Sequence, residues 1–113
     1  MEQTHRPTAL SASELADAMQ GNSSPQIIDV RPQPAFALSD RMIANAIRRN
    51  PEDIGRWMTE LDVTRAVVVY CVHGHQVSQG CASQLQDAGF RAAYLEAGFE
   101  HWASEGHAVM TKP

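Results

Sequence analysis

Residues 67–78, Val-Val-Val-Tyr-Cys-Val-His-Gly-His-Gln-Val-Ser, contain the pattern that decides the fold. The segment begins as an apolar run typical of a buried strand. It then passes Cys71 and Gly74, and residues 78–88 have the composition of a helix that Gly89 ends. This order predicts an anion cradle, because loop N–H groups and a helix N-terminus both favour negative charge. A cysteine at the base of such a cradle should ionise more readily than a free thiol.

Signals for strands and for helices alternate along the rest of the chain. Short apolar runs predict strands at 26–30, 66–70 and 91–95, and helix signals begin at 11, 51, 78 and 98. Residues 42–47 predict an extended segment with a turn, in which Asn45 is a candidate for left-handed backbone. The alternation predicts an α/β fold with a small, mainly parallel central sheet of about five strands and with helices on both faces.

Several helix starts carry caps that can be read directly. Ser11 and Glu14 have the spacing of a capping box. Asn50 is placed as an N-cap, with Pro51 at the first helical position. Ser78 is predicted to cap the helix that follows the cysteine loop.

Length and charge limit the function classes. A chain of 113 residues with 43% hydrophobic residues predicts one domain, over residues 8–113, after a loose tail at residues 1–7. The net charge is −4 and no Lys/Arg run occurs, so nothing favours nucleic acid or a membrane surface as a partner. The longest apolar run, 66–72, is far short of the roughly 20 residues of a membrane span.

The N-terminal sequence and the cysteine count predict a compartment. No apolar stretch follows Met1, so a signal peptide is not expected. The default is a cytoplasmic protein with reduced thiols, in which Cys71 and Cys81 form no disulfide scaffold.

The order of these segments resembles the single-domain rhodaneses, a family of sulfurtransferases. The matching pieces are spread over about residues 8 to 109. They are a strand that ends in Asp-x-Arg, two short segments between that strand and Asn50, the cysteine loop, and a closing strand followed by a turn and a tryptophan. These pieces are 27–31, 35–36, 42–47, 68–78 and 89–102. The resemblance implies the rhodanese-like α/β fold, and it implies no cofactor.

The cysteine loop departs from the family pattern, which commonly runs Cys-x-x-Gly-x-Arg-Ser. The spacing from Cys71 to Gly74 is kept, but Gln76 occupies the arginine position and Val77 is inserted before Ser78. The longer loop resembles those of dual-specificity phosphatases and arsenate reductases. Those enzymes need an arginine at the position that Val77 occupies here.

The resemblance implies covalent catalysis through Cys71. Its thiolate would attack the outer sulfur of thiosulfate or a similar small anionic donor, and the resulting persulfide would pass its sulfur to cyanide or to a thiol, which could belong to a protein. Asp29 and Arg31 are expected to support the site rather than react. The loop is expected to bind the anion through backbone N–H groups; these belong to Val72, His73, Gly74, His75, Gln76, Val77 and Ser78.

Several side chains have more than one interpretation. His73 and His75 are either exposed loop residues or a cation that partly replaces the absent arginine. With Cys71 they also have the short spacing of metal ligands, but no fourth ligand is evident nearby, and we predict no metal site. Cys81 is expected to be a core residue, and the alternative is that its thiol acts as a resolving thiol for Cys71. Trp57 and Trp102 are expected in the core.

Three functions follow, in order of preference. The first is a sulfurtransferase that uses Cys71. The second is a weakly active or inactive rhodanese-like module that binds a partner or senses an oxyanion, because the loop arginine is missing. The third is a phosphatase or arsenate reductase, which the loop length favours and Val77 opposes.

Overall fold

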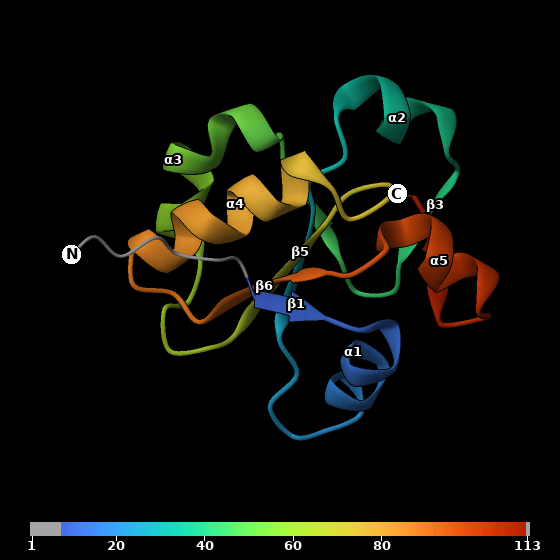
Figure 1. Cartoon of the computed structure of the whole chain (residues 1–113), viewed down its shortest axis with the longest axis horizontal. Helices are drawn as coiled ribbons and strands as arrows, with labels where there is room; N and C mark the ends of the chain where they lie inside the picture. Colours follow the sequence, from blue (N-terminus) through green and yellow to red (C-terminus); the bar gives the residue numbers. More distant parts are fainter. Residues whose placement is uncertain (1–7, 113) are drawn as a thin grey trace.

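The central sheet has five parallel strands in the order β1-β6-β5-β2-β4 (Figure 1). The computed structural model describes residues 8–112, so the predicted tail at residues 1–7 lies outside the described range. The strands of this sheet are β1 (Thr8–Leu10), β2 (Gln26–Asp29), β4 (Ile47–Arg48), β5 (Val67–Tyr70) and β6 (Ala92–Leu95). The α/β fold with a parallel sheet predicted from the sequence is therefore confirmed.

Helices cover both faces of the sheet, and alternate residues of each strand point to opposite faces. The helices are α1 (Ala12–Met19), α2 (Gln33–Leu38), α3 (Ile54–Trp57), α4 (Gln76–Asp87) and α5 (Gly98–Ser104), with 3-10 turns η1 (Pro51–Asp53) and η2 (Met58–Glu60). On β5, Val68 and Tyr70 join the core cluster beneath α1 and α5, whereas Val67 and Val69 join the cluster beneath α3 and α4. Both predicted core tryptophans are buried, at 3% exposure for Trp57 and 0% for Trp102.

A second, two-stranded antiparallel sheet was not predicted. It pairs β3 (Arg41–Ile43) with β7 (Val109–Thr111). These strands, like β1, have three residues each, which is too short for an alternating pattern to stand out in the sequence. Among the described residues, no helix has the length and apolar character needed to cross a bilayer.

The local signals at the helix starts are confirmed in part. Ser11 and Glu14 form the capping box, and the Asn50 side chain accepts from the Glu52 N–H. Asn45 has φ 67°, as expected for left-handed backbone. The helix after the cysteine loop is the exception: it begins at Gln76, so Ser78 is not its N-cap.

A buried ionic cluster ties the ends of β2 and β5 together. Arg31 forms a 2.7 Å ion pair with Asp29, and both side chains are almost fully buried. The Tyr70 hydroxyl donates to Asp29 Oδ2 at 2.9 Å and accepts from the Ile43 N–H at 3.0 Å. Burial, together with the Asp29 carboxylate, raises the pKa of Tyr70 far above its usual range, so its hydroxyl stays a donor.

Replacing Tyr70 by Phe should lower the free energy of unfolding by about 1–3 kcal/mol. The change removes one donor from Asp29 and leaves the buried Ile43 N–H without its acceptor. Urea titration at neutral pH measures the loss. Tyr94→Phe is the matched control, because the half-buried Tyr94 hydroxyl has no hydrogen bond within residues 8–112. Equal losses in the two variants would contradict the role of Tyr70.

Candidate active site

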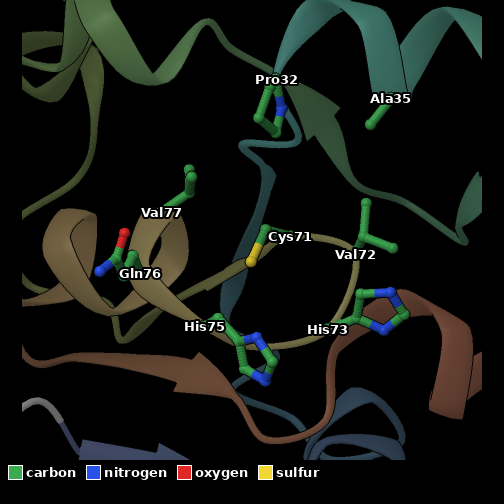
Figure 2. A pocket seen from close by; sticks show the side chains of 8 residues that line it. All are labelled: Pro32, Ala35, Cys71, Val72, His73, His75, Gln76 and Val77. Atoms are coloured by element: carbon green, nitrogen blue, oxygen red, sulfur yellow. The ribbon is translucent and has the colours of Figure 1, made fainter.

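A cavity of about 540 Å³ opens in front of Cys71 (Figure 2). It lies where β2 and β5 end, because Cys71 directly follows β5 and Pro32 follows β2 after a short turn. Carboxyl ends of parallel strands are where open α/β folds place ligands. The cavity is lined by Pro32, Ala35, Cys71, Val72, His73, His75, Gln76 and Val77.

Pro32 and Ala35 are wall residues that were not predicted from the sequence. Both are near the start of α2, which follows the strand beside β5 in the parallel sheet. Their position just after a predicted parallel strand was the signal in the sequence that could have identified them as wall residues. In contrast, Gly74 and Ser78, which were expected to bind substrate, do not line the cavity wall.

The Cys71 sulfur sits inside the arc of the loop rather than sealed in the core. The residue is 5% exposed and its side chain is part of the cavity wall. Ser78 is fully buried in the first turn of α4, and its hydroxyl lies 3.1 Å from Cys71 Sγ. Since a thiolate can only accept, the hydroxyl would donate to it. Ser78 therefore contacts the Cys71 sulfur from the first turn of α4 and does not cap this helix.

The start of α5 sets the orientation of the loop peptides. The Phe99 N–H donates to the Cys71 carbonyl at 2.9 Å, and the Glu100 N–H donates to the Val72 carbonyl at 3.1 Å. In a trans peptide the N–H points opposite to the C=O. The N–H groups of Val72 and His73 therefore point away from α5, and Figure 2 shows the Cys71 sulfur on that side.

The loop N–H groups have no hydrogen-bond partner within the described part of the chain. No carbonyl or side chain among residues 8–112 accepts a hydrogen bond from the N–H groups of residues 72–78. Those of 76–78 are also the free donors of the first turn of α4. Gln79 fixes the far side of the loop, where its Nε2 donates to the Gly74 carbonyl at 2.9 Å. Unpaired backbone amides of this kind can bind an anion.

Two glycines allow the loop to approach the turn before α5. Gly74 has φ +75°, and a Cβ there would lie 2.7 Å from the Ala97 N atom. Gly98 has φ +69°, and a Cβ there would lie 2.4 Å from the Val72 carbonyl oxygen. Any larger residue would separate the two segments and break the hydrogen bonds that orient the loop.

The cavity wall has no fixed positive charge. Within the described part of the chain, its lining includes no lysine or arginine. Arg31, a predicted supporting residue, is buried against Asp29 and does not line the cavity. Its guanidinium lies 4.5 Å from the Phe99 ring centroid and so supports the start of α5.

The side chains of His73 and His75 form an exposed part of the cavity wall. Both are exposed, their ring centroids are 6.0 Å apart, and Figure 2 shows both rings outside the arc that holds the sulfur. Across residues 8–112, no group of three or more His, Cys, Asp or Glu side chains could hold a metal ion. The metal interpretation of Cys71, His73 and His75 therefore has no ligand set.

Cys81 packs in the core cluster beneath α3 and α4, as predicted. It is 3% exposed. Burial, and secondarily the neighbouring Cys71, raise the pKa of the Cys81 thiol to about 12. A thiol that stays protonated is a poor nucleophile, so the resolving role is disfavoured.

The raised pKa of Cys81 predicts a loss of stability at alkaline pH. Above about pH 8.5 the thiol ionises in the unfolded chain but not in the folded one, so ionisation favours unfolding by as much as about 1.4 kcal/mol per pH unit. The effect is absent below pH 8.5 and levels off near the folded pKa of about 12. Urea titrations of the wild type and Cys81→Ala from neutral to alkaline pH measure it. The wild type should lose stability more steeply, and parallel curves would contradict the burial argument.

Comparisons with known proteins agree with this geometry. The chain is 33% identical over 94 residues to the thiosulfate sulfurtransferase GlpE of Shewanella oneidensis, covering 82% of this chain and 89% of that one. It is 32% identical over 77 residues to the GlpE of Pseudomonas syringae, covering 67% and 70%.

A solved structure and a family model give the same result. The crystal structure of a rhodanese-related protein from Thermoplasma volcanium superposes with a TM-score of 0.80 at 24% identity, covering 93% of this chain and 99% of that one. The family model for the rhodanese-like domain matches residues 11–105. With the parallel sheet, the cysteine after β5 and the amide-lined loop, these matches show that the chain belongs to the rhodanese-like family.

Proposed function

We propose that this protein is a cytoplasmic sulfurtransferase that carries a sulfane sulfur on Cys71. The observation that carries the proposal is that the N–H groups of residues 72–78 have no partner among residues 8–112, in a loop that curves around the Cys71 sulfur at the cavity wall (Figure 2). The donor is thiosulfate or a related small anion, and the acceptor is cyanide or a thiol. The GlpE relatives, which are thiosulfate sulfurtransferases, support the same donor class.

The reaction divides into two displacements at sulfur. The Cys71 thiolate attacks the outer sulfur of thiosulfate, the S–S bond of the donor breaks, and sulfite leaves with the electron pair. In the second step the acceptor attacks the outer sulfur of the Cys71 persulfide. The new S–S bond of the enzyme breaks, and Cys71 returns as a thiolate while the acceptor departs as thiocyanate or a new persulfide.

The loop amides serve both steps. They stabilise the oxyanion of the bound donor and then the negative charge on the outer sulfur of the persulfide. The Ser78 hydroxyl, 3.1 Å from Cys71 Sγ, donates to the attacking sulfur and to the same sulfur when it leaves. His73 and His75 line the same cavity as Cys71, so either ring can meet a bound donor anion, and we assign neither a covalent step.

Incubation with excess thiosulfate should add one sulfur atom to the protein, because Cys71 holds the persulfide after sulfite leaves. Intact-mass spectrometry under non-reducing conditions measures the gain. Cyanide should then remove it with the release of thiocyanate. Cys71→Ala should gain nothing, while Cys81→Ala should load like the wild type, since Cys81 is buried with a raised pKa.

Absence of loading with thiosulfate and with an organic persulfide would contradict the proposal and favour the alternative, a rhodanese-like binding or sensing module. Hydrolysis of an aryl phosphate that is lost in Cys71→Ala would favour the phosphatase interpretation instead. The lack of an arginine in the cavity wall opposes phosphatase activity, since no fixed cation is present to stabilise a transferring phosphoryl group.

Gln76→Arg should lower the apparent KM for thiosulfate by about tenfold, because a cation at the cavity wall attracts a dianion that now meets only amides. Steady-state kinetics with cyanide as acceptor measure the change. Gln84→Arg is the matched control, because it adds the same charge two helical turns along α4, outside this cavity. If both variants or neither change KM, loop charge does not limit donor binding.

A further inference from the structure

A second hollow of about 430 Å³ adjoins the Cys71 cavity. The two share Pro32, Gln76 and Val77 as common walls, so together they form one groove along α4. The second hollow is lined by Pro32, Gln33, Pro34, Asn50, Pro51, Glu52, Gln76, Val77, Gly80, Cys81 and Gln84. We refer to these two connected hollows as the α4 groove. The reaction proposed above uses only its Cys71 end.

Gly80 leaves space in the floor of this groove. Gln76, Gly80 and Gln84 follow one another at intervals of four residues and so share one face of α4. Glycine is unfavourable in the middle of a helix, apart from proline the least favourable residue. Gly80 is exposed and a Cβ there would meet no atom within 4 Å, so packing inside the chain does not require a glycine. Its missing side chain instead gives a ligand room to approach the helix backbone.

The groove walls match an extended peptide. The exposed side chains of Gln33, Gln76 and Gln84 form no hydrogen bonds among residues 8–112, so all three carboxamides can pair with a ligand. A carboxamide both donates and accepts, as a peptide group does. Three prolines, Pro32, Pro34 and Pro51, also line this hollow, and a proline packs without offering a competing N–H.

The charge of the groove selects among peptides. Of the described residues that line the second hollow, Glu52 alone is charged, and the chain as a whole carries a net charge of −4. Acidic segments are therefore repelled, and neutral or basic segments are favoured.

We propose that the α4 groove binds the cysteine-bearing segment of a protein acceptor, in extended conformation and of neutral or basic charge. The inference rests on the proposed sulfurtransferase function. The acceptor cysteine enters the Cys71 cavity while its flanking residues lie over Gly80, between the start of α2 and η1. Its thiolate attacks the outer sulfur of the Cys71 persulfide, the S–S bond to Cys71 breaks, and Cys71 leaves as a thiolate.

The test compares how fast different acceptors discharge persulfide-loaded protein. The acceptors are cyanide, N-acetylcysteine amide, a blocked lysine-containing peptide with a single cysteine, and its glutamate-containing twin. The lysine peptide should react about tenfold faster than N-acetylcysteine amide, because binding along the groove contributes to the transition state. The glutamate twin should lose most of this advantage.

Gly80→Leu should abolish the advantage of the lysine peptide and leave the rates with cyanide and N-acetylcysteine amide unchanged. Gly55→Leu is the matched control, since Gly55 is also an exposed helical glycine with no atom within 4 Å of its Cβ position but lines neither hollow. It should keep the advantage. Equal rates for the peptide and N-acetylcysteine amide, or a Gly80→Leu loss shared by all acceptors, would overturn the inference.

A binding measurement separates this inference from the proposed function. A fluorescent copy of the lysine peptide with serine in place of cysteine should raise its anisotropy with wild-type protein and with Gly55→Leu, but not with Gly80→Leu. If the protein fails to load sulfur but binds this peptide, the proposed function fails and the groove remains. If it loads sulfur but does not bind the peptide, only the groove assignment fails.

Discussion

Two hydrogen bonds from the start of α5 control the site. The Phe99 and Glu100 N–H groups bind the carbonyls of Cys71 and Val72, which turns the N–H groups of Val72 and His73 away from α5, to the side on which Figure 2 shows the sulfur. The contact is possible because Gly74 and Gly98 lack side chains where the two segments meet. A cradle of free amides around a cysteine is thus a consequence of how the last helix packs against the loop.

The ends of β2 and β5 hold the base of this arrangement. Tyr70 precedes Cys71 and is tied through Asp29 to Arg31, whose guanidinium lies against the Phe99 ring at the start of α5. One buried cluster therefore braces both the strand that carries the cysteine and the helix that orients its loop. Because Asp29 neutralises Arg31, the cluster adds rigidity without placing a net charge at the site.

The site relies on amide dipoles instead of a fixed cation. Amides and the α4 N-terminus favour an anion, but each contributes only partial charge. Among the described residues that line the cavity there is no arginine or lysine of the kind that a phosphoryl-transfer site uses to hold its dianion. The groove that continues past Gln76 and Val77 provides the surface on which the proposed binding of a protein acceptor depends.

The order of strands and helices, the capped starts at Ser11 and Asn50, and the cysteine after β5 could all be predicted, because periodicity, caps and turns are local properties of the chain. The strands β1 and β7 escaped prediction, and the extended segment at 42–47 was predicted without the partner of β3, because these pairings join residues distant in sequence. The sequence by itself determined which residues form the loop and that it lacks an arginine. Only the tertiary structure decided that Ser78 contacts the sulfur, that Pro32 and Ala35 line the cavity, and that α5 turns the loop amides inward. Those features arise where separate segments meet, and no local pattern encodes the distance between them.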